Sequence, residues 1–246
     1  MIRNLRFLNG NVLKILAAIF MVIDHVGFMF FPSNMVYRYV GRLAMPIFAF
    51  MIAEGCRYTK DKLRYFLTIA VLGTLCQVVY FIFDPSAYLF NILITFSLGI
   101  LGIYSLEFMK KALLEQGNSL KKKILSVVLF ILTIACVYVF CYFFVVDYGF
   151  LGCMLPVFAS LFDFRRVKNE SVKIYDRLVL RVLTFSLGLV LFVLTSEVIS
   201  FSVYSLFSLI LLFLYSGRRG KYKMKYFFYV FYPLHLVVIE GIYMLI

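Results

Sequence analysis

Two histidines, an aspartate and an arginine in apolar surroundings are the residues of this sequence best suited to chemistry. Asp24 and His25 lie about two thirds of the way along an apolar stretch, residues 12–31, that is long enough to cross a bilayer as a helix. Arg42 and His235, the second of the chain's two histidines, lie in other apolar stretches. Ionisable side chains inside a membrane are costly and mark functional sites by default.

Two interpretations of these residues are open. Neutral imidazole at His25 could act as a general base, with a carboxylate fixing its tautomer. Adjacent residues on a helix point about 100° apart, so Asp24 need not bond to His25 and could instead pair with Arg42. Arg42 could also bind a substrate carbonyl or carboxylate. Alternatively, these groups bond only to one another and hold helices together.

The composition identifies the class of protein. Of the 246 residues, 64% are hydrophobic, whereas soluble proteins have about half. Near-continuous apolar runs of about 20 residues favour spanning helices over a barrel. We therefore expect an all-α polytopic membrane protein, a bundle of about nine transmembrane helices. The expected spans are residues 12–31, 36–54, 63–83, 89–109, 124–144, 148–163, 178–198, 201–216 and 225–245, of which the sixth and eighth are short.

The connections between these spans alternate in charge. One set is rich in Lys and Arg: MIRNLR, CRYTKDKLR, KKALLEQGNSLKKK, DFRRVKNESVKIYDR and SGRRGKYKMK. The other set almost lacks them: FPSN, DPSAY, VVDYG and SEVIS. Basic connections remain cytoplasmic, so we expect a cytoplasmic N-terminus and an outward C-terminus. The same sorting accounts for the net charge of +13 and predicts no nucleic-acid partner. Short connections predict one domain, residues 1–246.

Span direction places the four polar residues at one depth. At about 1.5 Å per residue, Asp24, His25, Arg42 and His235 fall in one layer near the middle of the membrane. Prolines in two of the spans are expected to disturb helices nearby: Pro46 should kink the second span, and Pro233 should break the last.

A second polar cluster is expected at the cytoplasmic end. Its members are Lys14, Glu54, Arg57, Tyr58, Lys60 and Arg64. Topological sorting alone predicts Lys and Arg there, and the functional alternative is a vestibule for the phosphates of an anionic cytosolic cofactor. Glu54 is not explained by sorting and could pair with Lys14 or Arg57. The scattered cysteines form no CxxC motif, so we expect apolar packing roles for them and no metal site.

Several segments together resemble one known family. They are LKILAAIFMVIDHVGFMFFP, YRYVGRLAMPIFAFMIAEGCRYTKDKLRYF, DYGFLG, LYSGRRG and FYPLHL. In sequence and order they resemble the TraX family, whose founding member is the F-pilin acetylase of conjugative plasmids, within the wider transmembrane acyltransferases. The resemblance covers essentially the whole chain. It implies that the IDH motif supplies an acyl-transfer histidine, His25, with Asp24 beside it. It also matches Arg42, Glu54, Arg57, Tyr58 and His235.

The function implied by the resemblance is membrane acetyl transfer. The co-substrate would be cytosolic acetyl-CoA, with its phosphates at the basic cluster. The acceptor would be an amine or hydroxyl, on a pilin N-terminus or on a surface peptide or glycan, in or across a bacterial cytoplasmic membrane. Membrane lipid is the other expected partner. Direct transfer and a transient acetyl-histidine are both open. The rival hypotheses are a proton-coupled transporter or flippase and a non-enzymatic membrane partner.

Overall fold

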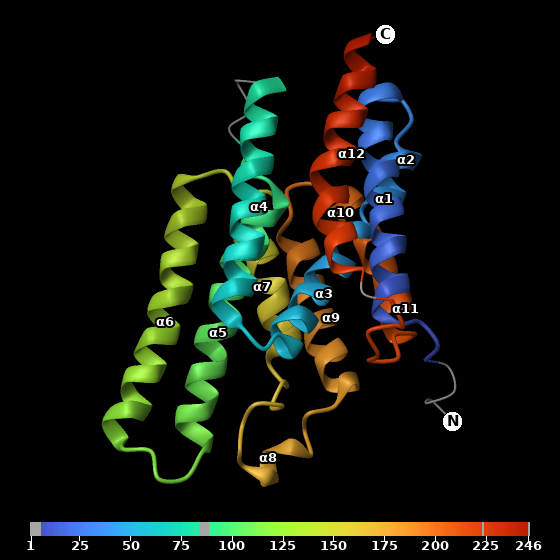
Figure 1. Ribbon diagram of the computed structural model, residues 1–246. Coiled ribbons are helices and arrows are strands. Elements are labelled where there is room, and N and C mark those ends of the chain that lie inside the picture. The colour runs from blue at the N-terminus through green and yellow to red at the C-terminus, as the bar shows by residue number, and fades with distance from the viewer. Residues whose placement is uncertain (1–5, 84–88, 223, 246) are drawn as a thin grey trace. The chain divides into compact units, whose positions relative to one another are not determined.

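The structure, a computed structural model, describes residues 6–83, 89–222 and 224–245. Figure 1 shows that these residues form helices, and the β-pairing they contain is limited to two isolated bridges. The all-α fold class is confirmed. Seven helices of the described chain are long and apolar enough to cross a membrane. The protein is therefore a multi-pass membrane protein.

Nine apolar helical stretches of the described chain follow the expected spans. The long ones are α1 (Gly10–Phe30), α2 (Val36–Gly41) with α3 (Ala44–Tyr58), α4 (Lys62–Phe83), α5 (Ile92–Leu114), α6 (Leu120–Phe143), α9 (Leu178–Thr195) and α12 (Lys225–Leu245). The sixth and eighth are shorter, as expected: α7 (Gly149–Ser160), and α10 (Ile199–Ser202) with η2 (Val203–Phe207) and α11 (Ser208–Phe213). A short helix, α8 (Glu170–Lys173), lies in the connection between α7 and α9.

The helices group into two compact units. Unit 1 contains residues 1–51, 75–86 and 189–246, and unit 2 contains residues 52–74 and 87–188. Helices α3, α4 and α9 each contribute residues to both units. The single domain inferred from sequence stays a prediction.

In unit 1, the start of α1 is tied to the last basic connection. The side chain of Asn9 caps the helix by accepting hydrogen bonds from the backbone N–H groups of the first turn. The N–H of Gly10 donates to the Arg218 carbonyl at 2.8 Å, and the N–H of Asn11 donates to the Arg219 carbonyl at 3.0 Å. Two basic segments thus lie at the same end of α1, as the charge pattern requires.

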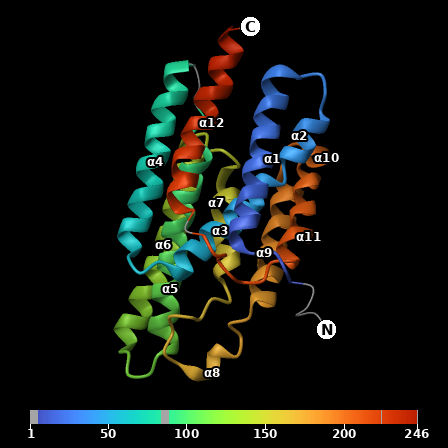
Figure 2. The same cartoon turned by 45° about the vertical axis from the view of Figure 1, so that its right-hand side comes forward.

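Close approach of α1 and α2 depends on two glycines. A Cβ atom at Gly27 would collide with Tyr37, and one at Gly41 would collide with the side chain of Asp24. Figure 2 shows α2 beside α1 and α10. The lack of a side chain at Gly41 therefore brings the second span against the carboxylate of the first.

The two prolines behave differently. The second span is interrupted at residues 42–43, directly before α3, and Pro46 lies in the first turn of α3. There the missing N–H of proline costs little. The expected break at Pro233 is wrong, because α12 runs through this residue as one helix. Packed membrane helices tolerate internal proline when surrounding groups compensate for the lost hydrogen bond.

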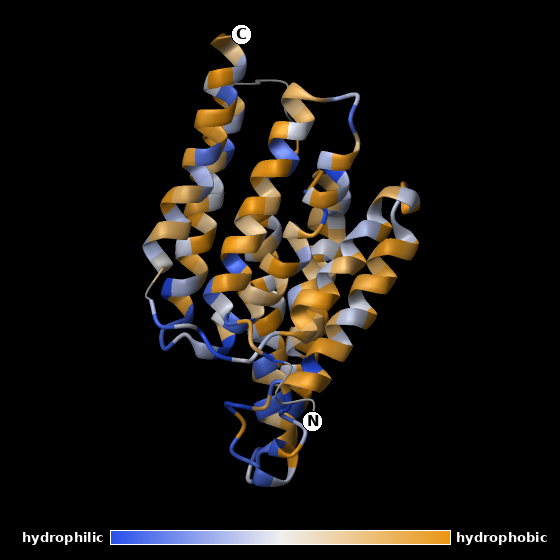
Figure 3. Ribbon diagram, turned by 90° about the vertical axis from the view of Figure 1, so that its right-hand side faces the viewer, coloured by the Kyte–Doolittle hydropathy of each residue, from blue (hydrophilic) through white to orange (hydrophobic). Residues whose placement is uncertain are grey.

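Unit 2 is built around the short helix α7, which packs on α5 and α6. At one end, the N–H of Phe90 donates to the Val145 carbonyl at 2.8 Å, and the N–H of Asp147 donates to the Phe90 carbonyl at 2.9 Å. Two connections poor in Lys and Arg meet there, although residues 84–88 (DPSAY) lie outside the described part. Figure 3 shows apolar residues along the helices and hydrophilic residues gathered in several connections. Such a surface suits a bilayer.

Candidate functional site

The two histidines contact each other in unit 1. His25 on α1 and His235 on α12 lie near opposite ends of the sequence, yet their ring centroids are 5.1 Å apart with an interplanar angle of 85°. Figure 1 shows α1 and α12 side by side. His235 is buried and His25 is half-buried. The contact agrees with the common depth expected from sequence.

Hydrogen bonds to backbone carbonyls define the tautomer of each ring. Nδ1 of His25 lies 2.8 Å from the Met21 carbonyl, and Nδ1 of His235 lies 3.2 Å from the Phe231 carbonyl. A carbonyl only accepts, so each Nδ1 carries the proton and each neutral imidazole has its lone pair on Nε2. Nε2 of His235 is buried and has no hydrogen-bond partner among the described residues. The lone pair on Nε2 of His235 is therefore left to meet a reactant.

Asp24 pairs with Arg38, a residue that sequence analysis missed. Oδ2 of Asp24 accepts a hydrogen bond from the Arg38 guanidinium at 2.6 Å. The tautomer of His25 is thus held by the Met21 carbonyl and not by this carboxylate. Within the described chain, Oδ1 of Asp24 is buried without a hydrogen-bond partner. The signal that could have identified Arg38 is its place one turn before Arg42, close after the FPSN connection that follows α1.

Arg42 lies at the break between α2 and α3. Its guanidinium carbon is 4.0 Å from the centroid of the Phe201 ring, in cation–π geometry. Tyr39 on α2 stacks on Tyr204 of η2 with 4.2 Å between the ring centroids. These contacts hold α2 against the α10–η2 segment. All four residues predicted as catalytic lie in unit 1, and the two histidines among them contact each other.

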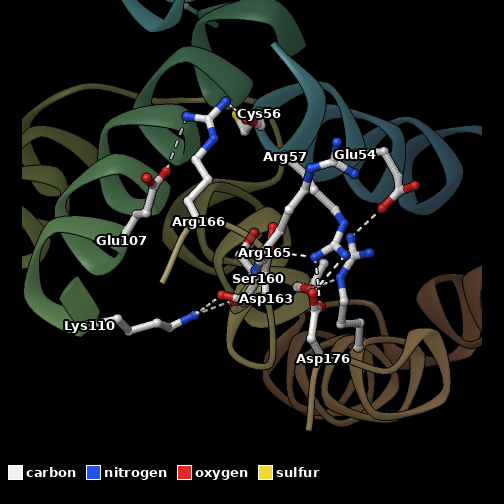
Figure 4. Close-up of polar contacts among 12 residues, drawn as sticks. Glu54, Cys56, Arg57, Glu107, Lys110, Ser160, Asp163, Arg165, Arg166 and Asp176 are labelled. Carbon is white, nitrogen blue, oxygen red and sulfur yellow. Dashed lines mark hydrogen bonds and ion pairs between the residues drawn. The ribbon is translucent and has the colours of Figure 1, made fainter. Parts of the chain in front are cut away.

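In unit 2, two of the predicted cofactor-binding residues belong to an ion-pair network, shown in Figure 4. Buried Glu54 pairs with Arg181, which lies 127 residues later on α9. Sequence analysis expected Lys14 or Arg57 as a partner of Glu54, and Arg181 is a partner that it did not select.

Arg57 bridges two carboxylates of the connection between α7 and α9. Its guanidinium pairs with Asp163 and makes two parallel hydrogen bonds to Asp176, at 2.7 and 2.9 Å. Such two-pronged pairs are geometrically specific. The positive charge of Arg57 is thus matched by acidic groups of the protein itself.

Further contacts close the network around a small pocket. Arg166 donates to the Thr59 carbonyl and lies 3.4 Å from Glu107. Nζ of buried Lys110 donates to the carbonyls of Ser160 and Asp163, at 2.6 and 3.0 Å, beyond the last turn of α7. A cation there stabilises the carbonyl end of a helix. The pocket is lined by Cys56, Arg57, Ile103, Leu106, Glu107, Lys110, Ser160, Asp163, Arg166 and Val167.

The other predicted cofactor-binding residues are outside these ion pairs. Tyr58, Lys60 and Arg64 are exposed in unit 2. Lys14 belongs to unit 1, with Nζ 5.8 Å from the centroid of the Phe228 ring. Among the described residues, no three His, Cys, Asp or Glu side chains are grouped as metal ligands.

Comparison with known proteins gives the family of the chain. The chain is 37% identical to an uncharacterised protein of Rickettsia prowazekii, RP591, over 94 residues that cover 38% of this chain and 36% of the relative, so the match spans about a third of that protein. It is 24% identical to a probable fimbrial assembly protein of Dichelobacter nodosus, FimC of serogroup H1, over 97% of each chain. No solved structure matches. The family model for TraX protein matches residues 9–243, and the chain therefore belongs to the TraX family.

Proposed function

We propose that this protein is an acetyltransferase of the bacterial cytoplasmic membrane. It would take the acetyl group of cytosolic acetyl-CoA and transfer it to an amine or hydroxyl acceptor in or across the membrane. The fimbrial name of the Dichelobacter relative and the resemblance to the F-pilin acetylase favour a pilin or another surface polypeptide as acceptor over a glycan.

The observation that carries this proposal is the contact between the two histidines. A buried imidazole with an unprotonated Nε2 that lacks a hydrogen-bond partner in the described chain is costly as a packing element. The lone pair on this nitrogen is left to accept a hydrogen bond from a reactant. We take this lone pair as the mark of a site built to receive a substrate, at which His25, whose ring contacts that of His235, is the general base.

In the proposed reaction, Nε2 of His25 takes the proton of the acceptor as its nitrogen or oxygen attacks the thioester carbonyl. The new carbon–nitrogen or carbon–oxygen bond forms, the carbon–sulfur bond breaks, and the CoA thiolate leaves and receives a proton. Neutral His235 accepts rather than donates at Nε2, because Nδ1 carries its proton. Arg42, always protonated, is then the better donor to the oxyanion. Attack by Nε2 of His25 itself, giving an acetyl-histidine, is the alternative route.

The test separates binding from chemistry in the purified full-length protein in detergent. We expect wild type to bind acetyl-CoA and to release free CoA slowly even without its acceptor. His25→Ala should retain binding and lose turnover by roughly 10²–10⁴-fold, the range for general base catalysis. Cys136→Ala, an exposed position on α6, is a control that should retain both.

If neither wild type nor variant binds acetyl-CoA, the proposal is wrong. The histidine pair would then be better explained as part of a proton path in a transporter, because paired ionisable groups within membrane helices also form such relays. Proton-coupled uptake or release of solute in proteoliposomes would distinguish that function.

A further inference from the structure

Beside the ion-pair network of unit 2 lies a group of basic and aromatic side chains that face solvent. We call it the Tyr58–Arg165 surface, made of Tyr58, Lys60, Arg64 and Arg165. All four side chains are exposed. The guanidinium carbon of Arg165 lies 4.4 Å from the centroid of the Tyr58 ring. Arginine stacked on an aromatic ring keeps the edges of its guanidinium group available to hydrogen-bond an anion.

The surface is held in place by neighbouring contacts. Arg166, next to Arg165, donates to the carbonyls of Cys56 and Thr59 and so fixes the connection after α7 onto the turn between α3 and α4. Asp61, the acid nearest in sequence, caps α4 by accepting from the N–H of Arg64 at 2.9 Å. Arg165 thus lies in a connection that the hydrogen bonds of its neighbour hold against the end of α3.

The cations of unit 2 divide into two groups. Arg57, Arg166 and Arg181 each have a carboxylate partner, whereas Lys60, Arg64 and Arg165 have none among the described residues. Topological sorting explains a positive charge at this end of the helices but not the stacking of Arg165 on an exposed tyrosine. An arginine stacked on an aromatic ring, with cations near in sequence that lack acidic partners in the described chain, suits a ligand that carries both phosphates and a planar base.

A buried donor nearby also lacks an acceptor. Nε of Arg57, the residue before Tyr58, is buried and has no hydrogen-bond partner in the described chain. The Arg57 side chain is 10% exposed and lines the small pocket. An anionic oxygen that reached this donor would satisfy it.

From these observations we infer that the Tyr58–Arg165 surface binds the nucleotide end of acetyl-CoA, with Arg165, Lys60 and Arg64 on the phosphates and the Tyr58–Arg165 stack beside the adenine. This inference rests on the proposed function for the identity of the ligand. It assigns a role to Arg165, which sequence analysis did not select. It also assigns Nε of Arg57 to an anionic oxygen of the ligand, while the rest of that guanidinium group stays paired with Asp163 and Asp176.

The test measures binding of acetyl-CoA and of adenosine 3′,5′-bisphosphate, the nucleotide part alone, to the purified full-length protein. Arg165→Glu should weaken binding of both by about tenfold or more, because it replaces a charge-assisted contact by repulsion. In turnover, the KM for acetyl-CoA should rise while kcat stays unchanged, since no reacting atom is touched. Tyr58→Leu should weaken binding less, because it removes the stack but retains the charge.

Lys121→Glu is the matched control, because Lys121 is an exposed residue of another basic segment in unit 2. Its affinity for both ligands should remain within about twofold of wild type. Equal weakening by Arg165→Glu and Lys121→Glu, or no weakening by either, would overturn the inference. Arg165-dependent binding of the bisphosphate without acetyl turnover would support the surface and contradict the acetyltransferase proposal. Turnover with an unchanged KM in Arg165→Glu would support the acetyltransferase proposal and contradict the role of the surface.

Discussion

The histidine pair of unit 1 and the ion-pair network of unit 2 are both built from ionisable residues of an apolar chain, but they differ in the partners that these residues have. Both contain ionisable residues of apolar helices, and the network of unit 2 also includes residues of the connection between α7 and α9. In unit 2, the four carboxylates Glu54, Glu107, Asp163 and Asp176 each face at least one cation. In unit 1, His25 and His235 contact only through their rings, and Nε2 of His235 lacks a hydrogen-bond partner among the described residues.

This difference separates structural from chemical use of polar groups in a membrane. A buried ion pair that is fully matched holds helices together and offers a reactant little. A buried base without a partner adds nothing to stability, so its presence is better explained by a reaction. Under the proposed function, the histidine pair carries out chemistry, whereas the Glu54–Arg181 pair holds helices together.

The largest effect is expected from removing the histidine pair. His25→Ala and His235→Ala should each lower acetyl-CoA turnover, by roughly 10²–10⁴-fold for His25. The double variant should be no more than about tenfold worse than the weaker single variant, because residues that act as a unit are not additive. The measurement is single-turnover release of CoA by the three variants.

The control for this cycle is Phe231→Leu. Phe231 stacks on His235 with 5.4 Å between centroids and carries no titratable group. Its substitution changes packing at the same place and should alter turnover only a few-fold. If the losses of turnover in the two single variants simply multiply in the double variant, the two histidines act separately. The histidine pair would then not be one chemical unit that can be compared with the ion-pair network.

The second prediction tests whether the buried Glu54–Arg181 pair holds the helices together. Arg181→Met removes the cation that pairs with buried Glu54, and should destabilise the protein by about 3–5 kcal/mol. The double variant Glu54→Gln with Arg181→Met removes both charges and should recover part of this loss. Thermal unfolding in detergent measures both.

Lys173→Ala is the control for the ion-pair experiment, because it removes an exposed pair with Glu170 on α8 and should change stability by at most about 0.5 kcal/mol. If Arg181→Met is as mild as this control, the buried pair does not hold unit 2 together.

The helices could be predicted from sequence because their signal is local. The length of the apolar runs predicted the all-α membrane fold, and the alternation of charge predicted which connections share an end of the helices. The hydrogen bonds from Gly10 and Asn11 to residues 218 and 219 join two basic segments, as this alternation predicts. The effect of Pro233 was not predictable in this way. Whether a proline ends a membrane helix depends on the groups packed around it, which lie far away in sequence.

For the candidate site, the depth of each residue along its helix could be predicted from sequence, but the partner of each residue could not. The direction of each span placed His25 and His235 at one level, and the structure brings their rings together. Partners were missed because they depend on rotation about the helix axis. Asp24 faces Arg38 rather than Arg42, and Glu54 faces Arg181 on a helix that sequence alone does not place beside it. Spacing along one helix gives a shared face, but not the neighbour across from it.

The smallest effect is expected from Asp24→Asn, which asks whether the acid beside His25 belongs to the chemistry or to the packing. Where a carboxylate fixes the tautomer of a catalytic histidine, its replacement by an amide lowers the rate of the enzyme by about 10⁴-fold. In this protein, the Met21 carbonyl holds Nδ1 of His25, while Asp24 bonds to Arg38. Asparagine occupies the same space against Gly41 and can still accept from Arg38. Turnover should therefore fall by no more than about tenfold, with a modest loss of thermal stability.

Asp24→Leu is the matched comparison, because it cannot accept from Arg38 and leaves that guanidinium without its carboxylate. It should lower stability more than Asp24→Asn does. A fall of several thousand-fold in Asp24→Asn at unchanged stability would instead couple the carboxylate to the proton of His25. Asp24 would then take part in the reaction although it has a cation partner. The presence of a partner would no longer separate structural from chemical residues, even within unit 1.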